Sequence, residues 1–302
     1  MKNISILGGA GLMGHGIALA CLTGSDARVT IVSRREATVE KGLDAVENGP
    51  YGLRKAVDRG RLTEEGLREA MSRLEGTTDY ADGLGSADLV FESIPEVPEL
   101  KLEALASAAE AAPPTAIVAT NTSSIMIAEL SSALPDPSRL VGTHWFYPSN
   151  VMPLVEVAPS ALTAPEVTGA VIDYLSTIRK RPVQVKDAPG FFMTRFVNSF
   201  IAEAIRSVEL GIAGPAEIDE MVKTGLGWPM GVFELLDDTA SFDAWYHAQE
   251  YLHDKCGDRY AVPPLAHQVF SAGFLGDSTF KHSSRGGWYE FLGADRPAAR
   301  EK

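Results

Sequence analysis

Short apolar runs and segments of helical periodicity alternate along the first half of the chain. Ile4–Leu7 and Val29–Val32 are compact apolar runs, and both have the length and composition of buried strands. Between them, apolar residues recur at helical spacing over 17–22. A strand, a glycine-rich turn, a helix and a second strand within about 30 residues predict a β-α-β unit.

The same alternation continues as far as residue 185. A polar, helix-like segment covers 36–71, and further strand patterns occupy 88–92, 115–119, 140–144, 153–157 and 182–185. Strands that alternate with helices form a mostly parallel sheet covered on both faces, because each crossover helix packs back on the sheet. We therefore expect an α/β domain in this half of the chain.

The pattern changes at 187–190, a cluster of turn-forming residues. Apolar residues then recur every three or four positions over 196–208, which predicts a long, largely buried helix. A second helix is expected over 215–225, since Gly-Pro is typical of a helix start and Gly of its end. The rest also has helical periodicity. We expect an α/β domain over 1–186 and a smaller all-helical domain over 187–302.

Composition excludes several classes of protein. The 302 residues include 27 Lys and Arg against 40 Asp and Glu, a net charge of −13, and 45% are apolar. These values are typical of a globular protein with a large core and exclude a disordered, collagenous or coiled-coil chain. An acidic chain without a basic stripe binds nucleic acid and anionic membranes poorly, so we expect neither partner.

The start of the chain and its cysteines indicate the compartment. Residues 1–3 lead directly into the first strand, and no apolar run reaches 18 residues. Cys21 and Cys256 lie far apart, and neither has the Cys or His partner of a metal site. We expect a cytoplasmic protein with reduced thiols and no metal.

The turn after the first strand contains Gly9-x-Gly11-x-x-Gly14. In this fingerprint the glycines permit a tight turn, close approach of a pyrophosphate and close packing of helix on strand. Leu12 and Met13 would open the helix, whose N-terminal N–H groups attract phosphate. The strand-turn-helix context therefore predicts a Rossmann-type dinucleotide-binding domain, the alternative being a glycine turn without a ligand.

Ser33-Arg34-Arg35 follows the second strand, where such domains normally carry an acidic residue that binds the ribose hydroxyls. A serine can hydrogen-bond a phosphate, and an arginine can clamp one through two N–H groups. We therefore predict NADP(H) as the preferred cofactor. NAD(H) is the alternative, with both arginines in solvent.

Three polar residues lie at or beside the ends of later strands: Ser123 in Asn-Thr-Ser-Ser, His144 in Gly-Thr-His and Glu156 in Leu-Val-Glu-Val. A doubly wound sheet binds its ligands at such strand ends. A histidine oriented by a carboxylate is a general base at neutral pH, and a nearby hydroxyl can hold a substrate oxygen. A structural histidine and a capping serine are the alternative.

A set of such motifs covers nearly the whole chain, at Gly9–Gly16, 121–124, 142–144, 152–157, 188–191, 216–219 and 229–235. In this combination the sequence resembles the 3-hydroxyacyl-CoA dehydrogenase family, and especially its short bacterial 3-hydroxybutyryl-CoA dehydrogenases. The resemblance implies a Rossmann-type domain followed by a helical domain that forms the interface of a homodimer.

The resemblance also implies residue roles. Ser123 matches the family's catalytic serine, which also contacts the cofactor. His144 matches the general base, and Glu156 matches the carboxylate that orients that base. Glu96 and Lys101 match cofactor-binding residues near the nicotinamide.

Substrate contacts are implied at four further positions. Lys55 and Arg59 lie in the polar helical arm, which in the family contacts the CoA nucleotide; ordinary exposed helix charges are the alternative. Tyr147 and Thr194 stand where the family usually has asparagines around the substrate carbonyl. These two replacements leave the acyl group and its carrier open.

The sequence thus predicts an enzyme that interconverts a 3-hydroxyacyl thioester, such as 3-hydroxybutyryl-CoA, and its 3-oxoacyl form with a nicotinamide cofactor. Two alternatives stay open. One is a biosynthetic dehydrogenase of a carrier-protein-bound or free hydroxy acid. The other is a cofactor-binding relative without turnover.

Overall fold

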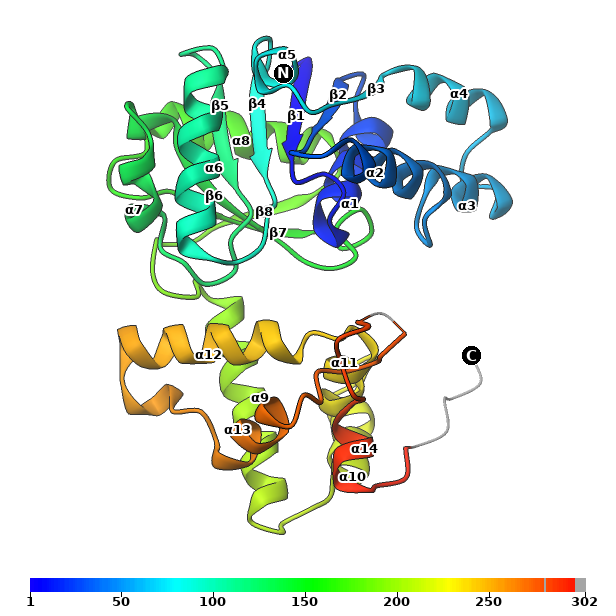
Figure 1. Cartoon of the computed structure of the whole chain (residues 1–302), viewed down its shortest axis with the longest axis vertical. Coiled ribbons are helices and arrows are strands. Elements are labelled where there is room, and N and C mark those ends of the chain that lie inside the picture. Colours follow the sequence, from blue (N-terminus) through cyan, green and yellow to red (C-terminus); the bar gives the residue numbers. More distant parts are fainter. Residues whose placement is uncertain (280, 297–302) are drawn as a thin grey trace. The chain divides into compact units, whose positions relative to one another are not determined.

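The computed structural model describes residues 1–279 and 281–296. The chain divides into two compact units, the first spanning Met1–Phe191 and the second beginning at Phe192 (Figure 1). The sequence analysis places the boundary slightly earlier, after residue 186. The segment in between therefore needs an explanation.

The turn cluster at 187–190 is held by the first unit. Asp187 accepts hydrogen bonds from the backbone N–H groups of Ile127 and Ala128, each at 2.8 Å. Phe191 is 3% exposed and packs in the core of the same unit. These contacts bring the end of the first unit to Phe191.

One sheet of eight strands organises the first unit, all of which is described. The strands are β1 (Asn3–Leu7), β2 (Arg28–Val32), β3 (Leu74–Thr77), β4 (Leu89–Glu92), β5 (Ile117–Thr120), β6 (Leu140–Trp145), β7 (Leu154–Ala158) and β8 (Arg181–Gln184). Their order is β3-β2-β1-β4-β5-β6-β7-β8, and every neighbouring pair is parallel except β6 with β7. The expected mostly parallel sheet is confirmed. The sequence pattern misses the edge strand β3 because it contains Glu75 and Gly76 and buries only Leu74.

Helices cover both faces of this sheet. They are α1 (Leu12–Gly24), α2 (Glu36–Asn48), α3 (Leu53–Asp58), α4 (Glu64–Ser72), α5 (Tyr80–Leu84), α6 (Pro98–Ala111), α7 (Ile127–Leu130) and α8 (Pro165–Thr177), with two short 3₁₀ turns, Ser131–Ala133 and Pro137–Arg139. In Figure 1, α6 lies in front of the strands and α8 behind them, and α3 and α4 extend sideways beyond the β3 edge. The polar segment expected over 36–71 is thus three helices, because turns containing Gly49, Gly52 and Gly60 interrupt it.

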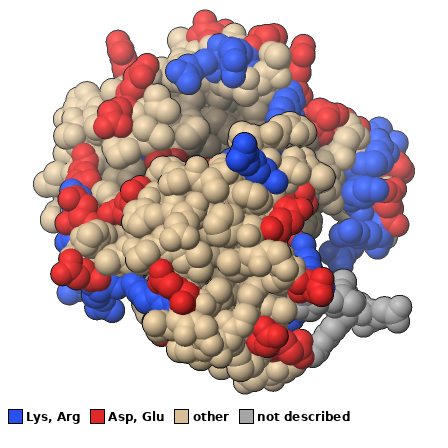
Figure 2. Space-filling view, turned by 60° about the horizontal axis from the view of Figure 1, so that its bottom comes forward, with Lys and Arg blue, Asp and Glu red and all other residues tan. Residues whose placement is uncertain are grey.

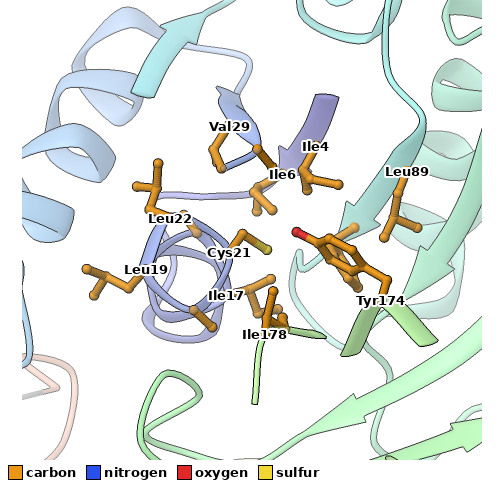
Figure 3. Packing of buried hydrophobic residues seen from close by; sticks show 14 of the residues in the cluster. Ile4, Ile6, Ile17, Leu19, Cys21, Leu22, Val29, Leu89, Tyr174 and Ile178 are labelled. Carbon is orange, nitrogen blue, oxygen red and sulfur yellow. The ribbon is translucent and has the colours of Figure 1, made fainter. Parts of the chain in front are cut away.

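The largest core cluster of the first unit lies between the sheet and the helices α1 and α8. Ile17 and Cys21 of α1 face Ile6 of the sheet, and all three are 0% exposed (Figure 3). The hydroxyl end of Tyr174, on α8, points toward Cys21 in this view. Burial raises the pKa of the Cys21 thiol to about 12, so this sulfur is neutral and serves packing.

The second unit is helical. It contains α9 (Met193–Glu209), α10 (Pro215–Gly225), α11 (Val232–Asp238), α12 (Phe242–Cys256), the 3₁₀ turn Asp258–Tyr260, α13 (Pro264–Ser271) and α14 (Trp288–Leu292). Apart from an isolated bridge between Gly276 and Gly286, its described residues form no strand pairing. The all-helical domain and the helix over 215–225 are confirmed. The expected burial along 196–208 is only partly right, since Phe196 is 48% exposed.

Two buried carboxylates cap short helices in the second unit. Asp219 accepts hydrogen bonds from the N–H groups that open α11, and Asp237 accepts one at 2.8 Å from the N–H of Trp288, which opens α14. A Cβ on Gly231 or Gly287 would lie 2.2 Å from the respective carboxylate carbon. Glycine is therefore required at both positions for the cap to approach.

None of the described helices is long and apolar enough to cross a membrane.

Candidate active site

The glycine turn after β1 is shaped by close approaches of backbone and side chains. Gly8 has a φ of +87°, so the left-handed conformation falls one residue before the first glycine of the fingerprint. A Cβ on Gly9 would lie 2.7 Å from Ile31, and one on Gly14 would lie 2.5 Å from the carbonyl oxygen of Gly8. The tight-turn role expected of Gly9 thus belongs to Gly8, while Gly9 and Gly14 allow the helix to pack on the strands.

A cavity of about 710 Å³ opens beside this turn. It is lined by the glycine loop, the end of β2, the start of α2, residues of α5 and α6 and the loop after β4. Gly11 is the N-cap of α1 and no side chain caps that helix, whose first residues are Leu12 and Met13. A helix N-terminus without a side-chain cap, a glycine loop and a cavity of this volume fit a dinucleotide.

The part of the cavity beside the end of β2 carries mixed charge. Ser33, Arg34 and Arg35 line it, and so does Glu103 from α6. Both arginines are exposed. Burial raises the pKa of Tyr80 at this end, with Arg34 acting against the shift and Glu103 adding to it, so all three side chains share one electrostatic environment.

His144 and Glu156 form a buried pair at the antiparallel junction of the sheet. They are direct cross-strand partners on β6 and β7, so their side chains lie on the same face. His144 Nδ1 lies 2.7 Å from Glu156 Oε2, and the residues are 6% and 2% exposed. Because Nδ1 donates its N–H to the carboxylate, Nε2 is the ring nitrogen that is left to accept a proton. The ring of Phe146 packs 4.4 Å from that of His144, centroid to centroid.

The loop of Ser123 follows β5, the parallel neighbour of β6. Glu96 Oε1 accepts hydrogen bonds from the backbone N–H of Ser123 at 2.8 Å, from the N–H of Ser124 at 2.9 Å and from the hydroxyl of Thr122 at 2.6 Å. Asn121 accepts a hydrogen bond from the backbone N–H of Trp145 at 3.1 Å. The strand ends that carry Ser123 and His144 are therefore joined directly.

A buried ion network supports Glu96. Lys101 is 0% exposed, and its Nζ lies 2.8 Å from Glu92 Oε1 and 3.5 Å from Glu96 Oε2. Burial acts to lower the pKa of Lys101, but the two carboxylates outweigh it and the pKa is raised. For Glu96, burial acts to raise the pKa, and Lys101 with the loop hydrogen bonds brings it below its usual range. Glu92 belongs to this ion network, and the sequence analysis does not predict it. The available signal was a carboxylate at the end of the strand pattern 88–92, four residues before Glu96.

The remaining predicted residues lie at separate places. Lys55 and Arg59 are exposed and four residues apart at α3, and Lys55 Nζ lies 3.6 Å from Asp58. Tyr147 is half-buried, with its ring edge-on to that of Tyr51 at 6.0 Å.

Figure 2 shows basic and acidic side chains interspersed on the face that it presents, with no continuous basic stripe.

Thr194 belongs to the second unit. It lies in the first turn of α9 and is 8% exposed. Its predicted contact with the substrate stays a prediction.

Comparison with known proteins identifies the family. The family model of the 3-hydroxyacyl-CoA dehydrogenase NAD binding domain matches residues 3–188, and that of its C-terminal domain matches residues 190–285. The chain is 36% identical over 255 residues to the mitochondrial hydroxyacyl-coenzyme A dehydrogenase of Rattus norvegicus, covering 82% of this chain and 80% of the relative. It is 33% identical over 270 residues to a probable 3-hydroxybutyryl-CoA dehydrogenase of Deinococcus radiodurans, covering 89% and 94%.

A solved structure agrees with both. The (S)-3-hydroxybutyryl-CoA dehydrogenase of Ralstonia eutropha matches with a TM-score of 0.86 at 33% identity, covering 92% of this chain and 96% of that one. The chain belongs to the 3-hydroxyacyl-CoA dehydrogenase family.

Proposed function

We propose that this protein interconverts 3-hydroxyacyl-CoA and 3-oxoacyl-CoA with a nicotinamide cofactor, and that short acyl chains such as 3-hydroxybutyryl are its substrates. The observation that carries the proposal is the buried His144–Glu156 pair, 2.7 Å apart on β6 and β7, with the Ser123 loop following the neighbouring strand β5. A histidine that a carboxylate orients in this way supports turnover over cofactor binding alone. The CoA thioester is favoured over a free or carrier-protein-bound hydroxy acid because the similar dehydrogenases are named for CoA substrates.

Each residue of the site has one role in this proposal. His144 Nε2 accepts the proton of the 3-hydroxyl group on oxidation and returns it on reduction. Glu156 holds the proton on Nδ1 and stabilises the imidazolium that forms. Ser123 donates a hydrogen bond to the reacting oxygen. A bound nicotinamide would accept the hydride from C3 of the substrate on oxidation and return it to C3 on reduction.

We further propose NADP(H) as the preferred cofactor. The supporting observation is that Ser33, Arg34 and Arg35 line the cavity at the end of β2. A 2′-phosphate there would meet cations and a neutral hydroxyl, and hydrogen bonds to charged groups contribute about 1.5–3 kcal/mol each. Glu103 lines the same cavity and opposes this preference, so the choice depends on which side chain reaches the phosphate.

The proposal assigns the CoA nucleotide to Lys55 on α3 and Arg59 at the C-terminal end of that helix, which are both exposed. Tyr147 and Thr194 then act on the acyl group and the thioester. Tyr147 follows His144 by three residues and packs against Tyr51, so it is the better supported of the two.

We also propose a homodimer formed through the helical unit. Several large apolar side chains of that unit are exposed in the single chain: Phe192, Phe196, Leu210, Ile212, Met221 and Leu226. Burial of such side chains stabilises an interface by about 25 cal/mol per Å² of apolar area, before the cost of association. Light scattering at micromolar concentration is expected to give twice the mass of the chain. The mass of a single chain would contradict the homodimer.

The function is tested by spectrophotometric assay of NADH and NADPH oxidation with acetoacetyl-CoA, acetoacetyl-pantetheine and free acetoacetate. We expect turnover with the CoA ester and weaker turnover with the truncated thioester. Activity confined to the free acid, or binding of cofactor without turnover on any of the three, would contradict the proposal.

A further inference from the structure

Lys180 is a buried lysine outside the site residues assigned above. It lies between α8 and β8 and is 7% exposed. Its Nζ donates hydrogen bonds to the backbone carbonyls of Ser149 at 2.6 Å and Met152 at 2.9 Å. It also lies 5.4 Å from the ring centre of Trp145, the residue after His144. Across the described part of the chain, no carboxylate pairs with this ammonium group.

The two carbonyls belong to the loop 148–153, which joins β6 to β7 and thus connects the strands of His144 and Glu156. The same loop packs on α1. The hydroxyl of Ser149 donates a hydrogen bond to the carbonyl of Met13 at 2.9 Å. A Cβ on Gly16 would lie 2.2 Å from that hydroxyl oxygen, so only glycine leaves room for the contact.

A buried charge held only by carbonyl dipoles and an aromatic ring costs free energy, because it loses its hydration without gaining an ion pair. Here all the contacts of the ammonium group named above converge on β6 and the loop that follows it. The loop in turn contacts the first turn of the helix that opens the dinucleotide cavity.

We propose that Lys180 is a positioning residue for the reaction: it fixes the loop 148–153 between the cofactor-binding end of α1 and the strand that carries His144. This inference rests on the proposed function. Loss of the ammonium would let the loop relax, and a displacement of about 1 Å between base and cofactor can cost about 10²-fold in rate.

The charge of Lys180 has few neighbours that titrate. Burial lowers the pKa of Lys180 to about 8, and Cys21 on α1 is the titratable group among the described residues that acts on this pKa, by raising it. The pKa of Cys21 is raised to about 12, so the thiol stays neutral in the relevant range. As the pH rises through about 8, Lys180 loses its positive charge and holds the loop carbonyls more weakly.

The test compares Lys180→Met, which keeps the length without the charge, with Lys180→Arg and with Arg181→Met. Arg181 is the exposed neighbour, so its variant controls for loss of a cation at the same turn. We expect Lys180→Met to lower kcat for acetoacetyl-CoA by about 10- to 100-fold and Arg181→Met to change it less than about twofold. In Lys180→Arg the rate should largely recover, and its loss near pH 8 should move to higher pH. Equal kcat in Lys180→Met and wild type, or an unchanged pH profile in Lys180→Arg, would overturn the proposal.

A second measurement does not depend on turnover. Hydrogen exchange of the backbone amides over 149–152 and NADPH binding followed by fluorescence are recorded for the same variants. We expect faster exchange and weaker NADPH binding in Lys180→Met alone. If the wild-type protein turns over none of the substrates but these changes occur, the proposed function fails and the positioning of the loop stands. If exchange and binding match those of wild type, the positioning role fails.

Discussion

Glu96 accepts a hydrogen bond from the backbone N–H of Ser123 at 2.8 Å, although 27 residues separate them in sequence. The same oxygen also accepts a hydrogen bond from the hydroxyl of Thr122, and the other oxygen lies 3.5 Å from Lys101 Nζ. A carboxylate that the family resemblance places beside the nicotinamide therefore also holds the loop of the proposed catalytic serine. Changes at this network should affect stability as well as activity.

Lys101→Met should destabilise the fold by about 3–5 kcal/mol, because it leaves the buried Glu92 carboxylate without its cation. Denaturant unfolding of the full chain measures the loss. The control is Lys55→Met, which removes an exposed pair with Asp58 and should cost less than about 1 kcal/mol. Similar losses of unfolding free energy in both variants would show that the buried ion network stabilises the fold no more than an exposed ion pair does.

His144→Gln should lower kcat by about 10²–10⁴, the usual contribution of a general base. Glu156→Gln should lower it by a similar or smaller factor, and the double variant should lose little more than His144→Gln because the two act as a unit. Steady-state kinetics with acetoacetyl-CoA gives the comparison, and cofactor binding should be retained. Near wild-type turnover in His144→Gln would remove the assignment of the base.

Cofactor preference should follow the end of β2. Wild-type kcat/KM is expected to be higher with NADPH than with NADH, and Ser33→Asp with Arg34→Ala should reverse the ratio by about two orders of magnitude. The new carboxylate would bind the ribose hydroxyls and repel a 2′-phosphate. A wild-type preference for NADH would contradict the prediction and would point to Glu103 as the stronger influence, without changing the roles of Ser123 or His144.

Asp237 should make stability depend on pH below neutrality. Burial raises its pKa to about 6, against the hydrogen bonds from the N–H groups that open α14. A carboxyl whose folded pKa is raised binds its proton more readily in the folded state, so it contributes stability as the pH falls through about 6. The difference in Tm between wild type and Asp237→Asn is therefore expected to grow in favour of wild type from pH 7 to pH 4.5, by the equivalent of about 1–3 kcal/mol. Parallel pH curves for the two proteins would refute this.

A truncated substrate tests the assignment of Arg59 to the CoA nucleotide separately from the catalytic roles. Arg59→Glu should raise KM for acetoacetyl-CoA more than for acetoacetyl-pantetheine, because only the former carries the nucleotide phosphates. The kcat values should change little, since Arg59 lies at α3, away from the strand of His144. Equal effects on the two substrates would indicate an exposed helix face without a ligand.

Local sequence determined much of this protein. Continuous apolar runs mark strands that are buried on both faces, and apolar residues every three or four positions mark helices, so the α/β domain and the helical domain could be predicted without tertiary contacts. The glycine motif requires residues without a Cβ wherever strand and helix approach closely. The motif can therefore be recognised from the sequence alone. The sequence pattern does not predict β3, because only one of its four residues is buried and a solvated edge strand needs no apolar run.

The assembly of the site was decided by tertiary structure. His144 and Glu156 become partners because β6 and β7 pair antiparallel in one particular register, and a shift of one residue would place them on opposite faces. In the sequence, Glu92 only ends a strand pattern, and no pattern distinguishes Lys180. Their importance follows from burial, because a charge that is harmless in water must find donors, acceptors or an opposite charge once folding removes its hydration.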